Sequence, residues 1–179
     1  MVDNAFLQVL QGAADGNAQS SAARIGNSVT LMRQLYTFSV DGLNPDTVLN
    51  DRWNQFRMII AEPLDGNQAL TLADILQYPS YGSSGVLVFS SPYTTKTTTN
   101  RRYKIHYDRN FELNATAKGA TRVMKKICKW GKTGKVVNFN GNTSAIPTDH
   151  NMSILFISDS GAVPHPTVSY SVRSTYKDA

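Results

Sequence analysis

The sequence predicts an all-β protein: one antiparallel domain of eight strands, with a single short helix between the second and third strands. Apolar side chains recur at every second position over most of the chain, which is the period of a half-buried strand. Clusters of Gly, Pro, Asn and Asp separate these runs, as turns require. The 179 residues show no repeat of solenoid or propeller length and suffice for one domain with a core. Eight short strands joined by turns indicate a sandwich or barrel, and eight is the strand number of a jelly roll.

The first two strands are predicted from alternation. From Ile25 onward, polar side chains such as Arg33 and Ser39 occupy one face. The opposite face is predicted to carry Thr30, Met32, Tyr36, Phe38 and Val40. The turn formers of Asp41–Asp46 end this run. In the second strand Arg57 is expected to point away from the face formed by Phe56, Met58 and Ile60.

The helix and the other six strands follow in order. Leu70–Leu76 has the apolar spacing of one or two helical turns, with Thr71 as its cap. Two later strands are predicted to form a hairpin closed by the turn Gly131–Gly134. The predicted strands are Gly85–Ser90, Arg102–Asp108 (with Tyr103, Ile105 and Tyr107 opposite Lys104, His106 and Asp108, and continued by Phe111 and Leu113), Arg122–Trp130, Lys135–Phe139, Met152–Phe156 and Val168–Tyr176.

Residues 1–24 differ from the rest and are predicted to be an N-terminal arm, flexible or partly helical. Asp3 could cap a short helix that ends at Leu10, while Gly12 and Gly16 oppose a longer one. The arm does not begin with the basic stretch and cleavage site of a secretory signal. Residues 25–179 are predicted to be the folded domain.

Composition and motifs argue against catalysis and against a cofactor. Cys128 is the only cysteine, which excludes a disulfide framework, and its strand position predicts a core side chain. The histidines His106, His150 and His165 lie far apart without metal-ligand spacing, so no metal site and no catalytic residue are predicted. No apolar run is long enough to span a bilayer.

Two weaker motifs favour ordinary turns over ligand sites. The Gly131-Lys132-Thr133 segment lacks the first glycine of a phosphate-binding loop, because Lys126 stands at that position. The oxygens of the first loop could bind calcium, but their spacing does not match a calcium-loop motif and favours a solvated turn. Those oxygens belong to Asp41, Asn44, Asp46, Asn50 and Asp51.

The charge pattern is the positive functional signal. The net charge is +5 and the isoelectric point about 9.4. Lysines and arginines concentrate between Arg122 and Lys135, and such a cluster either keeps a protein soluble or contacts a polyanion. The residues predicted to contact nucleic acid are Arg24, Arg33, Arg122, Lys125, Lys126 and Lys129. Lys132 and Lys135 are predicted to point outward and to contact a second polyanion.

Several short segments, in the same order, resemble one family. Arg24–Leu31 is similar to an Arg-x-Gly-x-x-Val entry into a first strand, and Asn100–Asp108 to a Lys/Arg-aromatic-x-Val/Ile-x-x-Asp strand. Phe56–Ile60, Leu72–Leu76, Val137–Gly141, Ile157–Ser160 and Tyr176–Asp178 complete the series. Over Arg24–Ala179 the chain resembles the capsid proteins of small viruses with circular, replication-initiator-encoding single-stranded DNA genomes. It is also similar to the coat protein of satellite tobacco necrosis virus.

This resemblance implies an eight-stranded jelly roll of viral coat type that assembles with itself. The implied particle is a T=1 icosahedral shell of about sixty copies around a single-stranded genome, expected to be DNA. The implied location is the virion, with assembly in the host cell, the nucleus included. A host receptor or surface polyanion is a further implied partner, membrane insertion is not implied, and calcium between subunits stays open.

The chain departs from the family in its arm. Members usually begin with an Arg/Lys-rich segment, whereas residues 1–23 contain neither residue type. A net charge of +5 over sixty copies gives about +300, against roughly a thousand or more phosphates of a small genome. We therefore expect that a basic segment has been removed, and that the chain as given packages nucleic acid weakly or assembles empty.

Two other classes compete with the coat hypothesis. A secreted-type jelly-roll binding module, lectin- or cytokine-like, would act as a monomer or trimer. A cupin-like metalloenzyme would need histidine and carboxylate ligands gathered on paired strands. The size of the purified protein separates the first class from a coat protein, and a metal analysis tests the second.

Overall fold

In the computed structural model the described residues form two antiparallel sheets of four strands each, with one short helix. The structure describes residues 2–3, 26–42, 53–64, 69–78, 89–94, 103–114, 121–141, 147–150, 152–159 and 166–178. The elements are β1 (Val2–Asp3), β2 (Ser28–Asp41), β3 (Trp53–Pro63), α1 (Leu72–Ile75), β4 (Tyr103–Asn114), β5 (Thr121–Lys129), β6 (Lys135–Asn138), β7 (Ser153–Ser158) and β8 (Thr167–Asp178). The all-β prediction is confirmed.

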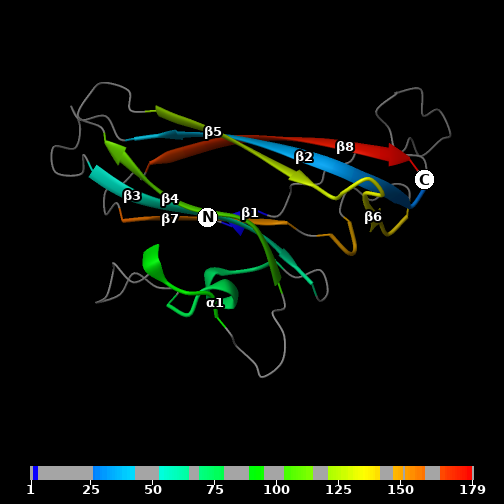
Figure 1. Cartoon of the computed structure of the whole chain (residues 1–179), viewed down its shortest axis with the longest axis horizontal. Helices are drawn as coiled ribbons and strands as arrows, with labels where there is room; N and C mark the ends of the chain where they lie inside the picture. Colours follow the sequence, from blue (N-terminus) through cyan, green and yellow to red (C-terminus); the bar gives the residue numbers. More distant parts are fainter. Residues whose placement is uncertain are drawn as a thin grey trace.

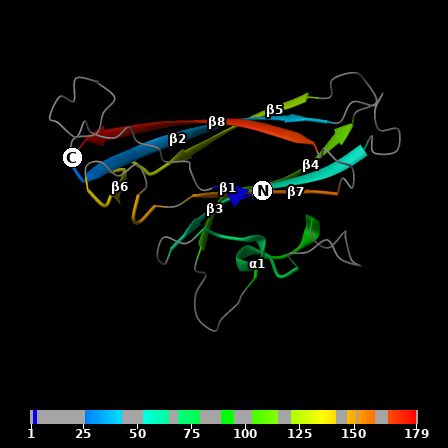
Figure 2. The same cartoon turned by 180° about the vertical axis from the view of Figure 1, so that it is seen from behind.

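The two sheets lie one above the other, and α1 lies on the far side of the lower sheet (Figures 1 and 2). The lower sheet has the strand order β1-β7-β3-β4. In the upper sheet β2 is central, because β8 pairs with it from Val29 to Asp41 along one edge. The other edge of β2 is shared by β6, opposite Ser28–Leu31, and β5, opposite Arg33–Asp41.

This arrangement shows that the predicted hairpin between β5 and β6 is wrong. Both strands run antiparallel to β2, so they follow one another along the same edge and do not pair with each other. The Gly131–Gly134 turn is an excursion between them, and Trp130 N–H donates to the Met32 carbonyl across its base at 3.2 Å. The same turn residues can close a hairpin or connect two strands that pair with one neighbouring strand. Packing on β2 decides between these two arrangements.

A bulge in β2 also corrects the predicted alternation. Val29 and Leu31 face inward, but the inward positions after the bulge are Gln34, Tyr36, Phe38 and Val40. The register with β8 shifts by one residue between Leu31 and Arg33, which inserts Met32 into β2. Thr30 and Met32 therefore lie on the outer face, whereas the predicted positions of Tyr36, Phe38 and Val40 are confirmed.

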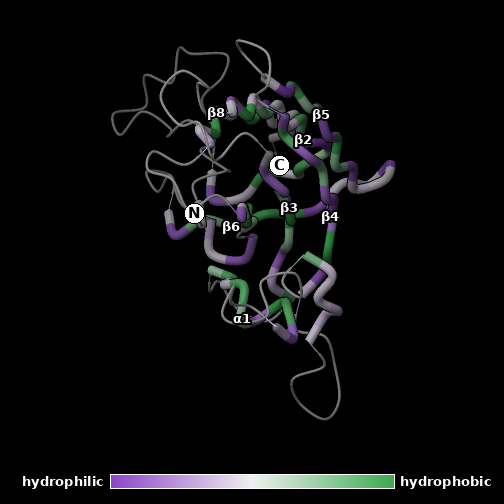
Figure 3. The backbone as a smooth tube through the Cα atoms, turned by 90° about the vertical axis from the view of Figure 1, so that its left-hand side faces the viewer, coloured by the Kyte–Doolittle hydropathy of each residue, from purple (hydrophilic) through white to green (hydrophobic). Residues whose placement is uncertain are grey.

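Aromatic and aliphatic side chains fill the space between the sheets, where Figure 3 shows hydrophobic backbone positions in β2, β3 and β4. The ring centroids of Phe56 and Phe111 are 4.9 Å apart, and those of Phe56 and Phe156 are 5.6 Å apart. Cys128 belongs to this core, as predicted, and burial raises the pKa of its thiol. The cluster also holds Tyr36, Phe38, Val40, Met58, Ile60, Leu113, Met152 and Ile154.

The lower sheet is buried on both faces, which the sequence did not predict for Arg57. A second core lies between this sheet and α1 with residues 89–94. Arg57 is only 5% exposed and binds Asp108 through two hydrogen bonds, of 3.0 Å from Nε and 2.7 Å from Nη2. It also donates to the carbonyls of Phe89 and Ser91, so it fastens the loop beneath the sheet instead of facing solvent.

The predicted helix is confirmed and the strand after it is not. The Asp74 carboxylate accepts the Thr71 N–H at 2.8 Å and the Thr71 hydroxyl at 2.6 Å, which caps α1 as expected. Of the predicted strand Gly85–Ser90, Phe89 and Ser90 lie in a helical turn, while residues 85–88 lie outside the described residues.

Part of the predicted arm is a strand. Val2 and Asp3 pair with Leu155 and Ile154 of β7, while the helix predicted to follow Asp3 lies outside the described residues. Residues 4–25, including Arg24, lie outside the described residues. No helix among the described segments is long and apolar enough to cross a membrane.

Candidate nucleic-acid interface

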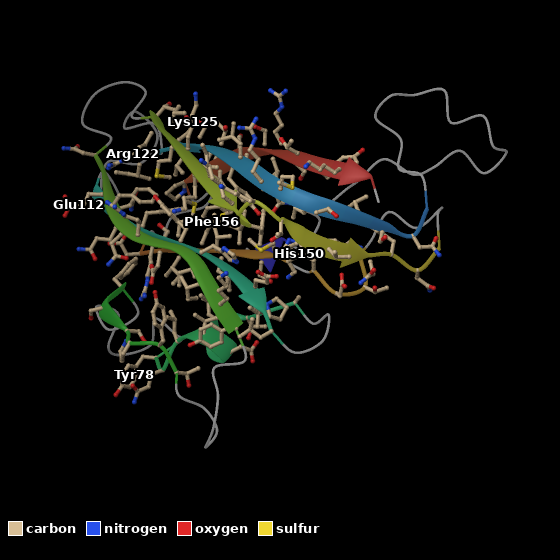
Figure 4. The ribbon with its side chains drawn as sticks, turned by 45° about the vertical axis from the view of Figure 1, so that its right-hand side comes forward. Tyr78, Glu112, Arg122, Lys125, His150 and Phe156 are labelled. Atoms are coloured by element: carbon tan, nitrogen blue, oxygen red, sulfur yellow. The ribbon has the colours of Figure 1, made fainter. Side chains whose placement is uncertain are left out.

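The outer face of the upper sheet gathers basic side chains from three strands. Cross-strand partners share a face, and β2 aligns Arg33 with Lys129, Thr37 with Lys125, Leu35 with Arg173, and Thr30 with Lys177. All five cations are exposed. We call this set the basic face: Arg33, Lys125, Lys129, Arg173 and Lys177. In Figure 4 Lys125 points away from the sandwich.

Few acidic groups balance these cations. The four strands of the upper sheet contain only two acidic residues, Asp41 and Asp178, each at the end of its strand. The Asp41 carboxylate accepts a hydrogen bond from the Thr121 hydroxyl at 2.5 Å. The centre of the basic face therefore carries positive charge without a nearby carboxylate of its own sheet.

One rung of the sheet places two cations directly opposite each other. Arg33 faces Lys129 in register, a like-charge pair that destabilises a sheet. Arg33 turns toward β8, where its Nε donates to Thr175 Oγ1 at 3.2 Å. An anion bound between Arg33 and Lys129 would relieve this repulsion. The pair is therefore compatible with the binding of a polyanion on this face.

Exposed apolar side chains lie among the cations. Val123 and Ile127 of β5 are 60% and 47% exposed, and Val136 of β6 is 56% exposed. They share the outer face because their partners Ser39, Leu35 and Thr30 do. The basic face thus combines cations for phosphates with small apolar surfaces, and its described side chains include no aromatic ring on which a base could stack.

Two predicted contact residues point the other way. The Arg122 guanidinium lies 5.2 Å from the centre of the Phe111 ring and donates to the Glu112 carbonyl at 3.5 Å. The Lys126 ammonium lies 5.4 Å from the centre of the Tyr107 ring. Cation–π contacts with β4 therefore hold both residues at the edge between the two sheets, outside the basic face (Figure 4 shows Arg122 there).

The predicted outward pair Lys132 and Lys135 is also separated. Lys132 is exposed in the Gly131–Gly134 turn, but Lys135 faces inward and forms an ion pair with Glu62 of β3. The alternation of β6 explains the difference, since Val136 takes the outer position and Lys135 the inner one. The prediction that Lys135 contacts a polyanion on the outside is wrong. Arg24 lies outside the described residues, and the structure adds Arg173 and Lys177, whose face was not predicted from the sequence.

The Lys135–Glu62 pair is part of a buried polar cluster. The Glu62 carboxylate accepts hydrogen bonds from His106 Nε2 at 2.8 Å and from His150 Nδ1 at 2.8 Å, besides the ammonium of Lys135. Burial alone would raise the pKa of Glu62, but these three donors together hold it well below its ordinary value. Two histidines that are remote in the sequence therefore meet on one carboxylate, while His165 lies outside the described residues.

A bulge in β4 brings His106 into this cluster. Ile60 pairs with Tyr107 and Ala61 with Ile105, so His106 is an extra residue opposite the Ile60–Ala61 peptide. The strict alternation predicted for this strand is therefore wrong at His106. A sequence signal for Glu62 did exist, since it continues the inward positions 56, 58 and 60.

The described residues contain no group of three or more His, Cys, Asp or Glu side chains arranged to hold a metal ion. Of the loop oxygens considered for calcium, Asp41 is described, and residues 44, 46, 50 and 51 lie outside the described part. No protein-family model and no curated protein matches this chain. The family resemblance therefore remains a prediction from the sequence.

Proposed function

We propose that this protein is a viral coat protein, which assembles with itself into a small icosahedral shell around a single-stranded genome. The basic face carries this proposal: three strands present Arg33, Lys125, Lys129, Arg173 and Lys177 on one surface. Its role is structural, without catalysis. The described cations would bind phosphates, and this attraction does not depend on the base sequence.

The chain path supports the finer proposal of a jelly roll. Consecutive strands repeatedly change sheet: β2 lies in the upper sheet, β3 and β4 in the lower, β5 and β6 in the upper, and β7 in the lower. Such crossings between two packed sheets are typical of Greek-key sandwiches. They also leave long edge strands, which assembly could cover.

The assembly part of the proposal is tested by particle mass. Light scattering after chromatography, with absorbance at 260 and 280 nm, is expected to show a particle of about sixty subunits, as the resemblance implies, with little nucleic acid unless a basic arm is added. A species that stays monomeric or trimeric with and without such an arm would overturn the coat proposal. That outcome would favour the lectin- or cytokine-like binding module.

The basic face is tested by binding of a fluorescent single-stranded oligonucleotide of thymidines. The variant Lys125→Gln/Lys129→Gln removes two cations of the face, and the control Lys104→Gln/Arg109→Gln removes two exposed cations of β4. The first variant is expected to bind more weakly, with a salt slope reduced by about 1.4, because each phosphate contact contributes about 0.7. Equal slopes in the two variants would show that nucleic acid binds elsewhere.

A further inference from the structure

The cluster around Glu62 joins the two sheets through ionisable side chains. Glu62 belongs to β3 and His106 to β4 of the lower sheet, while Lys135 belongs to β6 of the upper sheet. His150 comes from residues 147–150, before β7, and lies between the layers in Figure 4. The exposed fraction of the side chains is 3% for Glu62, 0% for His150 and 9% for His106, so water reaches the carboxylate poorly.

One positive charge already balances the carboxylate. Lys135 has an ammonium group, which can only donate, and it forms an ion pair with Glu62 Oε1 across the sheet interface. His106 and His150 each supply one more hydrogen bond, for which a neutral imidazole N–H is sufficient. With both imidazoles neutral, the cluster of Glu62, Lys135, His106 and His150 would carry no net charge.

A further proton would disturb this balance. His150 and Lys135 bind the same oxygen, so their nitrogens are at most about 6 Å apart, twice a hydrogen-bond length. Because Nδ1 of His150 donates to Glu62, an added proton would go to Nε2. That atom is buried and has no hydrogen-bond partner in the described part of the chain. The neighbouring Trp130 Nε1 also has no hydrogen-bond partner in that part of the chain. An indole N–H can only donate, so it cannot accept a hydrogen bond from a protonated Nε2.

We propose that this cluster stabilises the contact between the two sheets in a pH-dependent way. The contact is stable while both imidazoles are neutral, and acidification from pH 8 to 5.5 weakens it. Imidazole is the side chain whose charge changes in this range. By linkage, stability falls as the pH is lowered wherever the unfolded chain takes up more protons than the folded one.

Other ionisable groups from several elements surround the cluster. Burial raises the pKa of Tyr36 on β2 and of Cys128 on β5, which keeps both neutral. Asp149, beside His150, is engaged by the backbone and side-chain amides of Asn138. Lys104 of β4, paired in register with Glu62, and Lys126 of β5 are cations on the neighbouring strands.

Lys135 sets the direction of the response. In Lys135→Met the carboxylate would stay buried without its cation, and a proton taken up by His106 or His150 would replace the missing charge. The variant is therefore expected to become more stable on acidification from pH 8 to 5.5, the reverse of the parent protein. A purely structural role for Lys135 would lower stability equally at every pH.

The test measures urea unfolding between pH 8 and 5.5 in a Trp53→Phe background, where Trp130 is the one remaining indole. The centroids of the His106 and His150 rings lie 6.0 and 5.4 Å from that of Trp130, so a protonated imidazole would also quench its native emission. The parent unfolding constant is expected to rise about tenfold over this range. The double variant His106→Gln/His150→Asn keeps a donor at each position but does not titrate, and it is expected to lose most of this rise and the quenching.

His165 and the rest of the chain are the same in every variant, so their titration cancels in the comparison. An unchanged pH response in the double variant, or a Lys135→Met response of the same sign as the parent, would overturn the proposal. If Lys135→Met does not fold, the double variant and its native emission decide alone. The readouts are the pH dependence of unfolding and the emission of Trp130, not particle mass or oligonucleotide binding, so failure of this test leaves the proposed coat function untouched.

Discussion

Replacement of Gly134 by alanine is expected to destabilise the protein much more than the same change at Gly131. Both glycines lie in the turn between β5 and β6 and both have φ of +72°. An alanine in this left-handed conformation costs roughly 1–2 kcal/mol at either position. The two sites differ in what a new methyl group would meet.

At Gly134 the methyl group has no space. It would lie 2.6 Å from Thr30 Cγ2, 2.8 Å from Met32 Sδ and 2.9 Å from the Leu31 carbonyl oxygen. The Met32 side chain can move, but the Leu31 carbonyl belongs to β2, which is paired on both sides. Overpacking of this kind adds about 1–3 kcal/mol. At Gly131 nothing lies within 4 Å of the methyl position.

The expected losses are therefore about 2–5 kcal/mol for Gly134→Ala and about 1–2 kcal/mol for Gly131→Ala. A difference of about 2 kcal/mol corresponds to roughly 4–8 °C in melting temperature for a chain of this size. Urea unfolding and thermal melting of both variants measure it. Equal losses would refute the close approach of the turn to β2, and with it the placement of β5 and β6 on one edge.

Three further outcomes are expected. The folded pKa of Glu62 lies below its ordinary 4.5, so the stabilisation by its carboxylate is present above about pH 4.5 and is lost as the pH falls. The difference in unfolding free energy between the parent and Glu62→Gln should therefore narrow between pH 5 and 3. A constant difference would contradict the linkage. Arg57→Ala should cost about 3 kcal/mol or more in urea unfolding, since it leaves Asp108 partly buried without its cation, and a loss below about 1 kcal/mol would be inconsistent with that ion pair. Burial raises the pKa of Cys128, so a thiol reagent should modify it far more slowly in the folded protein than in urea, and similar rates would contradict its core position.

The strands themselves could be predicted because alternation is a local property. Tyr36, Phe38 and Val40, then Met152, Ile154 and Phe156, point into one core as their period-two spacing predicts. The capped helix at Thr71 depends on contacts only three residues apart. The positive charge between Arg122 and Lys129 was also visible, but the face that each side chain would occupy was not.

Where prediction failed, one strand depended on another that is distant in the sequence. The bulges at Met32 and His106 exist only relative to β8 and β3, so no count along a single strand reveals them. Each bulge inserts one residue and moves every later side chain to the opposite face. This shift brings Met32 to the outer face and His106 to Glu62.

The sequence by itself determined the all-β class, most strand positions, the helix cap, the buried cysteine and the excess of positive charge, because these depend on composition and on neighbours a few residues apart. Only the tertiary structure decided that β5 and β6 share one edge of β2, that Arg173 and Lys177 join the basic face, and that Lys135 turns inward to Glu62. These features depend on which strands pack together, and that choice is made by the whole core.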